Sequence, residues 1–301
     1  MPEALSLLTC PVRGCGLRLN RSGRALACPR RHSFDIARSG YVNLLQPNDR
    51  RSIAAGDSKE AVAARARLAA TGISRPTTDR IVDIAISLLR GDSLDVTDPP
   101  DLPVPPVPPV LPVVVDLGSG TGDVLSALAR ARPTSGVGID LSTIAVDYAA
   151  RRFPGLTWVV ANADRRIPLA GGTVDLVLSV HGRRNAAECA RVLGPHGHLI
   201  VAVPAPDDLI ELREAVQGQR PKGPHDVERD RADQVIREHA RLFTFVSRLV
   251  VREQQRLQRD ALLDLLATTY RGARRSAAQK VRTLDALDVK VATEVVLFDR
   301  K

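Results

Sequence analysis

An apolar run that leads straight into closely spaced glycines, "VVVDLGSGTG" at residues 113–122, constrains the fold of this chain most strongly. A nearly continuous apolar strand is typical of a parallel sheet, whose strands are buried on both faces. The glycines allow a sharp turn into the helix predicted over 123–133, and they let the backbone approach a ligand closely. The segment therefore predicts an α/β fold with a binding site at this turn.

The alternation of strand and helix patterns continues after this turn. It predicts a parallel sheet covered by helices on both faces, in which ligands bind at the carboxyl ends of the strands. The further strands are expected at 136–140, 156–164, 174–180 and 198–204, and the further helices at 142–154 and 185–197.

Composition gives a first indication of partners and location. The 301 residues carry a net charge of +9, which favours a polyanionic partner such as nucleic acid, although an arginine-rich proteome would give the same charge. No apolar run approaches the roughly 20 residues that cross a bilayer, and no signal peptide is recognisable. We therefore expect a cytoplasmic protein with reduced thiols and no membrane partner. The sequence leaves a homodimer open.

Three of the four cysteines lie within the first 28 residues. Together with a histidine they form the pattern C-x4-C-x12-C-x3-H, and the intervening "LRLNRSGRALA" predicts a hairpin with its tip near Ser22 and Gly23. Two close pairs of thiol and imidazole ligands are typical of a structural zinc site, and free buried thiols or a disulfide are the alternatives. The expected zinc ligands are Cys10, Cys15, Cys28 and His32, whereas Cys189 is expected in the core.

Two helices are predicted between the cysteines and the first buried strand, over 58–72 and 75–91. Proline dominates residues 98–112, so this segment should be extended and semi-rigid. We therefore divide the chain into a zinc-binding module (1–45), a helical connector with a proline-rich linker (46–112) and a Rossmann-like domain (113–301). The polar, proline-broken stretch 219–234 is expected to be a loop or lid.

The glycine turn distinguishes between two classes of ligand. Its spacing is G-x-G-x-G with Asp116 two residues before the first glycine, whereas dinucleotide sites use G-x-G-x-x-G. Asp140 ends the second strand, where an acid would accept hydrogen bonds from ribose hydroxyls, and Asp164 follows the third strand, where it could meet an adenine. This pattern resembles the S-adenosylmethionine-binding domain of class I methyltransferases. A helix-capping role for Asp116 is the simpler alternative.

The N-terminal half carries a more specific resemblance. Residues 28–45 ("CPRRHSFDIARSGYVNLL"), "GDS" at 56–58, Ala64 with Arg65, and Gly72 with Pro76 resemble the RlmA-type methyltransferases. The resemblance implies a zinc-binding, S-adenosylmethionine-dependent enzyme that methylates N1 of a guanine in a 23S rRNA hairpin, and some members confer resistance to macrolides such as tylosin. It implies cofactor contacts from residues that follow the turn and strand ends. These are Ser74, Asp116, Gly118, Gly120, Thr121, Gly122, Asp140, Leu141, Asp164 and Asp208.

The sequence departs from the family pattern around this pocket. The first cysteine pair is C-x4-C where the family has C-x2-C, and the glycine turn continues into Thr121 and Asp123 where the family has glutamate and tyrosine. Ser74 and Asp208 stand where the family has a cofactor-contacting tyrosine and histidine. Two rival functions are therefore kept: a class I methyltransferase of another RNA or of a small molecule, and a non-catalytic RNA-binding protein.

Candidate residues for the chemistry and for RNA contact follow from position. His181, just beyond the fourth strand, is the candidate catalytic base, with a pocket-lining histidine as the alternative. Arg183 and Arg184 could hold phosphate or form a solvated turn. Basic and aromatic residues near the zinc ligands could bracket a hairpin loop, although Phe34 could equally be a core contact. The RNA-binding candidates are Arg30, Arg31, Phe34, Arg38, Tyr41, Arg50 and Arg51.

Overall fold

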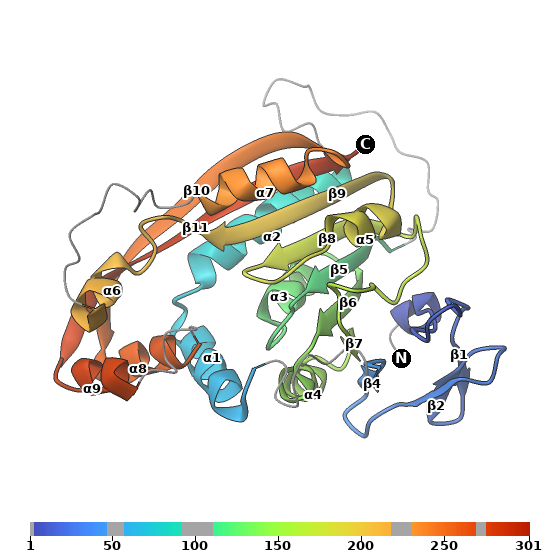
Figure 1. Cartoon of the computed structure of the whole chain (residues 1–301), viewed down its shortest axis with the longest axis horizontal. Coiled ribbons are helices and arrows are strands. Elements are labelled where there is room, and N and C mark those ends of the chain that lie inside the picture. The colour runs from blue at the N-terminus through green and yellow to red at the C-terminus, as the bar shows by residue number, and fades with distance from the viewer. Residues whose placement is uncertain (1–2, 47–56, 92–110, 218–229, 269–274) are drawn as a thin grey trace.

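A computed structural model describes residues 3–46, 57–91, 111–217, 230–268 and 275–301 (Figure 1). Its centre is one mixed sheet of eight strands. The strands are β4 (Val42–Asn43), β5 (Val113–Leu117), β6 (Ser135–Asp140), β7 (Thr157–Val160), β8 (Val174–Val180), β9 (Leu193–Pro204), β10 (Phe243–Gln258) and β11 (Ala286–Arg300). Their spatial order is β10-β11-β9-β8-β5-β6-β7-β4.

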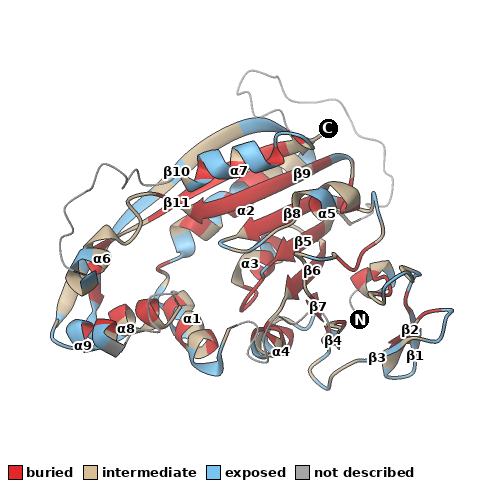
Figure 2. Cartoon of the chain, viewed as in Figure 1, coloured by how far each residue is buried: buried red, intermediate tan, exposed pale blue. Residues whose placement is uncertain are grey.

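The strands from β4 to β9 are parallel, as the alternating pattern predicts. Helices cover both faces of the sheet, so its central strands are buried (Figure 2). One apolar core holds side chains of α2 (Arg75–Arg90), α3 (Asp123–Ala131) and α4 (Thr143–Arg152). A second core on the opposite face holds side chains of α5 (Ala186–Val192) and α7 (Arg231–His239). The predicted Rossmann-like α/β fold is confirmed.

The buried side chain of Trp158 lies so close to the backbone at two positions that only glycine fits there. A Cβ on Gly122 would lie 2.4 Å from the indole, and one on Gly138 would lie 2.2 Å from it. The indole N–H donates to the carbonyl of Phe153 at 2.9 Å, which satisfies its one polar group. The largest side chain of the domain therefore packs directly beneath the glycine turn because these two glycines leave space for it.

Residues 3–46 form the small ribbon that the cysteine spacing predicts. It contains the 3-10 helix η1 (Glu3–Leu7) and a three-stranded antiparallel sheet of β1 (Asn20–Ser22), β2 (Ala25–Ala27) and β3 (Ser33–Asp35). Arg21 pairs with Leu26, which confirms the hairpin. Figure 1 shows the ribbon at the β4 end of the large sheet.

The ribbon does not have a core of its own. Its buried residues, among them Leu8, Leu19 and Val42, belong to the same apolar cluster as Leu117 and Ile139 of the central strands. The backbone of β4 extends the large sheet by pairing with β7, and Leu8 bridges to Leu169. The proposed boundary at residue 45 therefore separates segments that share one core and one sheet.

The C-terminal third contains elements that the sequence analysis did not anticipate. Strands β10 and β11 pair over 15 register positions as a long antiparallel hairpin, and β11 lies antiparallel to β9. A third apolar cluster gathers at the far end of this hairpin. It joins α1 (Lys59–Thr71), α6 (Ile210–Gln217), α8 (Arg259–Thr268) and α9 (Arg275–Val281) to the two strands.

Other sequence expectations have mixed outcomes. Helices α1 and α2 match the predicted ranges, and Ser58 and Gly72 cap α1. The predicted loop over 219–234 is wrong at 231–234, where Asp230 accepts from the N–H of Asp233 and starts α7. The helix predicted over 185–197 ends at Val192, because Leu193 is already extended at φ −64° and ψ 140°. Residues 98–110 and 219–229 lie outside the described ranges. None of the helices described is both long and apolar enough to span a membrane.

Candidate functional site

The glycine turn joins β5 to α3 at the carboxyl edge of the parallel strands. Gly118, Gly120 and Gly122 all have positive φ, at 72°, 52° and 83°, a region that other residues rarely adopt. The N–H of Gly120 donates to Oδ2 of Asp140 at 2.9 Å, which fixes the turn against the end of β6. The turn is therefore anchored to β6, and Gly118 and Gly120 put no side chain of their own between its backbone and the space above it.

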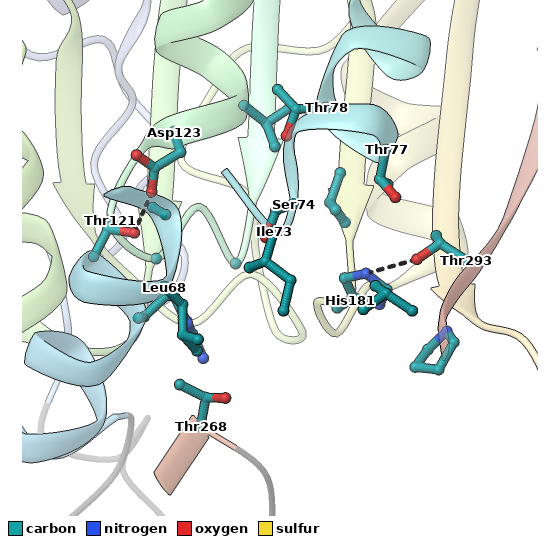
Figure 3. A pocket seen from close by; sticks show the side chains of 18 of the residues that line it. Leu68, Ile73, Ser74, Thr77, Thr78, Thr121, Asp123, His181, Thr268 and Thr293 are labelled. Atoms are coloured by element: carbon teal, nitrogen blue, oxygen red, sulfur yellow. Dashed lines mark hydrogen bonds between the residues drawn. The ribbon is translucent and has the colours of Figure 1, made fainter. Parts of the chain in front are cut away.

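A pocket of about 390 Å³ opens above this turn, within the range of small-molecule sites (Figure 3). The carboxyl ends of β5, β8 and β9 form its floor, and parts of α1, α2, α8 and β11 form its walls. Of the predicted cofactor residues, those at the pocket are Ser74, Asp116, Gly118, Gly120, Thr121 and Asp208. Thr121 donates to Asp123 at 2.5 Å within the same turn (Figure 3).

Asp116 is the most unusual polar group of the pocket. It is only 2% exposed, and its Oδ1 atom has no hydrogen-bond partner among the described residues. Burial, together with the nearby carboxylates of Asp140 and Asp123, raises the pKa of Asp116 to about 7. A buried carboxylate without a partner is costly, so a cationic ligand group would be strongly favoured beside it.

Four other predicted cofactor residues do not line the pocket described here. They are Gly122, Asp140, Leu141 and Asp164. The carboxylate of Asp140 accepts from the N–H groups of Gly120 and Ser142, so it organises the turn. The carboxylate of Asp164, which follows β7, forms an ion pair at 3.0 Å with Arg183, which follows β8. Their direct contact with a cofactor stays a prediction.

Asp208 and Ser74 both line the pocket. Asp208 accepts from the N–H of Ala292 at 2.9 Å, and burial raises its pKa. Ser74 precedes α2 without capping it, so its hydroxyl is exposed toward the pocket. Each replaces a larger side chain of the family pattern, and each lies at the cavity as the alignment of motifs predicts.

His181 follows β8 and faces the pocket from the side opposite the glycine turn's helix (Figure 3). Its backbone has positive φ, at 53°, and its Nε2 atom lies 3.4 Å from Oγ1 of Thr293. The protein surrounding the ring, and the positive charges of Arg65 and Arg231, lower the pKa of His181 to about 4. The imidazole is therefore neutral at physiological pH although it is accessible from the pocket.

Sequence reasoning missed much of the pocket wall. Helix α1 contributes Arg65 and Leu68, α8 contributes Thr268, and β11 contributes Thr293. These residues come from the predicted connector and from the C-terminal hairpin, for which no motif signalled a role at the site. Among these residues, only Arg65 belongs to the family motif, so it is the one whose role at the pocket the sequence could have indicated.

The four predicted metal ligands converge at one point of the ribbon. Their donor atoms all lie within 4.8 Å of one another. The sulfur atoms of Cys15 and Cys28 are 3.7 Å apart, and Nδ1 of His32 is 3.4 Å from the sulfur atoms of both Cys10 and Cys28. A tetrahedral zinc ion spaces sulfur ligands by about 3.8 Å and sulfur from nitrogen by about 3.5 Å. The donor set and its spacing therefore fit zinc.

Two of the ligand thiols differ in how readily they ionise. Burial raises the pKa of Cys10 to about 12, which favours its neutral thiol. Burial opposes ionisation of the Cys28 thiol, but the backbone N–H groups of His32 and Arg30 outweigh it and lower the pKa to about 7. The thiolate is the form that binds zinc. Cys189 is not among the four clustered donors. It is buried, and burial raises its pKa to about 12, in agreement with its predicted core position.

The predicted RNA-binding residues differ in their surroundings. Arg30, Arg31 and Arg38 are exposed on the ribbon, and Arg30 also donates to the carbonyl of Gly14 at 2.8 Å. Phe34 and Tyr41 are half-buried and pack against the two main cores, which limits the ring area free for stacking on a base. Arg50 and Arg51 lie outside the described residues.

Comparison with known proteins agrees with this arrangement of ribbon and pocket. Residues 8–53 match a family model described as "RlmA, N-terminal", and residues 114–197 match one described as "Methyltransferase domain". The first match contains the four metal ligands, and the second contains the glycine turn.

Three named proteins are similar over most of the chain. A Micromonospora griseorubida protein provisionally named a 23S rRNA (guanine-N(1)-)-methyltransferase is 39% identical over 70% of this chain and 70% of its own length. The 23S rRNA (guanine(748)-N(1))-methyltransferase of Streptomyces fradiae is 36% identical over 69% and 67%. The Bacillus subtilis protein YxjB, also provisionally named a 23S rRNA (guanine-N(1)-)-methyltransferase, is 32% identical over 72% and 71%.

Proposed function

The chain belongs to the 23S rRNA (guanine-N1)-methyltransferase family, and we propose that it transfers a methyl group from S-adenosylmethionine to N1 of a guanine in a 23S rRNA hairpin. The observation that carries the proposal is the pocket itself. A glycine turn, a buried acid without a partner and a neutral imidazole all line one cavity. A ribosomal RNA substrate also supports the expected cytoplasmic location.

The residues present fit S-adenosylmethionine. Asp116 offers an unpartnered carboxylate to a cationic group, and Gly118 and Gly120 line the pocket with backbone alone. We assign the walls of the ligand site to Gly118, Gly120, Ser74 and Asp208. When bound, S-adenosylmethionine supplies an electrophilic methyl group on a sulfonium centre.

The protein's own part in such a transfer is to position the guanine and to help its N1 proton leave. A low pKa makes His181 a weak base, but it keeps the ring neutral and able to accept a hydrogen bond from N1–H. Thr293, at 3.4 Å from Nε2, can hold the ring in place. His181 is therefore proposed as the residue that orients and polarises the guanine, and full proton abstraction by it would be slow.

We assign recognition of the RNA to the ribbon and to the strand ends near the pocket. Arg30, Arg31 and Arg38 can contact phosphates, which position an RNA without reading its sequence. Arg183 is exposed beside the pocket entrance but is paired with Asp164, so a phosphate would have to compete with that carboxylate. Metal binding would hold the ribbon in the shape that presents these side chains.

The decisive experiment maps modified guanosines in 23S rRNA by mass spectrometry, in cells with and without the gene. We expect one 1-methylguanosine to depend on the gene. The purified protein should produce the same mark on a 23S hairpin transcript in the presence of S-adenosylmethionine. A variant with His181→Ala should be slower in this assay while binding S-adenosylmethionine with unchanged affinity.

Two results would contradict the proposal in different ways. Methylation at another position, or of a small molecule without any RNA, would show that the protein is a methyltransferase but that the proposed substrate is wrong. Failure of the zinc-loaded protein to bind S-adenosylmethionine in a calorimetric titration would indicate an RNA-binding protein without this activity.

A further inference from the structure

The charged side chains that line the pocket are mostly acidic. Three acids line it, Asp116, Asp123 and Asp208, whereas Arg65 is its single lysine or arginine within the described part of the chain. His181 also lines the pocket, and the surrounding protein together with the charges of Arg65 and Arg231 lowers its pKa, so the ring is neutral. Arg65 is therefore the one arginine or lysine of the described lining that an anionic group of a bound ligand could contact, whereas Arg231 acts on His181 and Asp208 from outside the lining.

Arg65 reaches this position from outside the Rossmann-like repeat. It lies on α1, and its Nη1 atom is 2.9 Å from the position that a Cβ on Gly120 would occupy. The guanidinium thus rests directly on the tip of the glycine turn. Its side chain remains 36% exposed, so it can reorient toward a ligand.

One acid already orients this guanidinium. Oδ2 of Asp57 is 2.7 Å from Nη1 of Arg65, and the hydroxyl of Ser142 donates to the carbonyl of Asp57 at 2.9 Å. Ser142 in turn belongs to the loop that follows β6, next to Asp140. The pair is therefore attached to the same strand end that holds the glycine turn in place.

The amino-acid end of S-adenosylmethionine carries one ammonium and one carboxylate. The buried acids of the pocket suit the ammonium, and a guanidinium suits the carboxylate, to which it can donate two parallel hydrogen bonds. We propose that Arg65 binds the carboxylate of the S-adenosylmethionine amino-acid moiety, oriented by Asp57. This inference rests on the proposed function, since it assigns a ligand contact within the same pocket.

A purely structural role for Arg65 is the main alternative, and the chain contains a matched control for it. Arg67 lies on the same helix and forms an ion pair with Asp264 of α8, with Nε 2.8 Å from Oδ2, but it does not line the pocket. Replacing Arg67 removes an arginine and an ion pair from α1 without removing a pocket charge.

The test uses three ligands that differ at the amino-acid end. Calorimetric titrations of the zinc-loaded full chain would compare S-adenosylmethionine, S-adenosylhomocysteine and 5′-deoxy-5′-methylthioadenosine, which lacks the carboxylate and the ammonium. For Arg65→Gln we expect affinity for the first two to fall by about 10- to 100-fold, as for loss of a charge-assisted pair. Affinity for methylthioadenosine should change less than about twofold, and Arg67→Gln should leave all three affinities near the wild-type values.

Each contrary outcome has a distinct meaning. If Arg65→Gln lowered the affinity for all three ligands equally, Arg65 would only support the shape of the pocket. If the affinity for all three were unchanged, Arg65 would not contact the ligand. Weaker binding of a 23S hairpin alone would assign the guanidinium to an RNA phosphate. All three results overturn the carboxylate contact, whereas a wild-type protein that binds none of the ligands overturns the proposed function itself. Thermal unfolding of Arg65→Gln and Arg65→Lys would confirm that both variants are folded.

Discussion

The two ends of the large sheet are completed by segments of very different construction. At one end, the ribbon adds the two-residue strand β4 to β7, takes its apolar contacts from the central core and gathers four metal ligands. At the other end, β10 and β11, of 16 and 15 residues, form a long hairpin that is joined by ion pairs and by its own helical cluster.

The two end segments are stabilised in different ways. A short segment cannot bury enough apolar surface to fold by itself, so the ribbon depends on metal and on its neighbour's core. A long hairpin pairs its two strands along their whole length, and β11 also pairs with β9, so this end is built without a metal site among the described residues. The pocket draws its walls from the hairpin end, through Val291 and Thr293, and takes none of its lining from the ribbon. We therefore expect the two ends to respond differently to substitution.

Loss of the metal should have the largest effect, and it should be concentrated in the ribbon. Zinc supplies about 10–16 kcal/mol of apparent folding free energy in zinc-finger peptides. The double variant Cys28→Ser with His32→Ala should therefore lose its zinc and unfold residues 3–46, as measured by metal analysis and amide hydrogen exchange. Because the ribbon shares its core with Leu117 and Ile139, exchange should also increase at the β6–β7 edge.

Cys189→Ser is the control for this experiment, since Cys189 is buried away from the metal ligands. That variant should keep a full complement of zinc. Full zinc occupancy in the double variant would exclude Cys28 and His32 as ligands. Protection lost equally from β10 and β11 would show that the two ends do not fold as separately as their contacts suggest.

Removal of Arg248 should have the next largest effect, at the hairpin end. This residue of β10 joins Glu294 of β11, which is 2% exposed, at 2.6 Å, and it also pairs with Asp230 and Asp233 at the start of α7. Arg248→Ala would leave a buried carboxylate without its partner. We expect a loss of about 2–4 kcal/mol in the free energy of unfolding, measured with urea, below the full value for buried pairs because Arg248 is partly exposed.

Two further variants sharpen this prediction. Arg256→Ala removes an arginine from the same strand, but its pair with Asp288 is exposed on both sides and should contribute less than about 1 kcal/mol. Combining Arg248→Met with Glu294→Gln should recover part of the stability, because no buried charge remains. A loss for Arg256→Ala as large as that for Arg248→Ala would contradict the distinction between buried and exposed pairs.

The buried carboxylate of Asp116, between the two ends, should make stability depend on pH. The pKa of Asp116 is raised from 3.8 to about 7 in the folded protein, so the folded state binds more protons than the unfolded state between these pH values. The free energy of unfolding therefore falls as pH rises from 4 to 7, and the full penalty is present above pH 7. Asp116→Asn should raise the thermal midpoint at pH 8 by a few degrees and should have little effect near pH 4.

The same substitution should weaken the binding of S-adenosylmethionine. An amide cannot neutralise a cationic ligand group, so we expect affinity at pH 8 to fall by about tenfold or more. Asp79→Asn on the exposed side of α2 is the control for both measurements. A variant of Asp116 that is less stable at pH 8 would show that its carboxylate has favourable partners that outweigh burial.

The smallest effect is expected from the exposed arginines of the ribbon. Arg31 has a positive φ of 68°, so Arg31→Gly removes its charge without backbone strain, and it can be combined with Arg30→Ala. If both residues contact phosphate, the log–log salt slope of hairpin binding should flatten by about 1.4, at about 0.7 per contact with a single strand. Filter binding at several salt concentrations would measure the slope.

Zinc content and affinity for S-adenosylmethionine should be unchanged in this double variant, because neither residue is a metal ligand or lines the pocket. An unchanged salt slope would show that Arg30 and Arg31 do not contact RNA phosphates. Loss of zinc would instead show that the contact from Arg30 to the Gly14 carbonyl supports the metal loop.

The sequence by itself determined the features that depend on local patterns. Apolar strands alternating with helices predicted the parallel sheet, and the G-x-G-x-G spacing with Asp116 predicted the pocket-lining turn at its carboxyl edge. The spacing of Cys10, Cys15, Cys28 and His32 predicted a cluster whose geometry fits zinc. These predictions succeeded because turn chemistry, strand burial and ligand spacing are all set within short stretches of chain.

Only the tertiary structure decided which distant segments complete the site. Arg65 comes from a helix that the sequence indicated as a connector, and Thr293 comes from a strand that carries no recognisable motif. The sharing of one core by Leu8 and Leu117 is likewise invisible in sequence, because an apolar residue does not specify its partner. The lining and the charge of this pocket depend on contacts between residues far apart in the sequence, and such contacts form only when the whole chain folds.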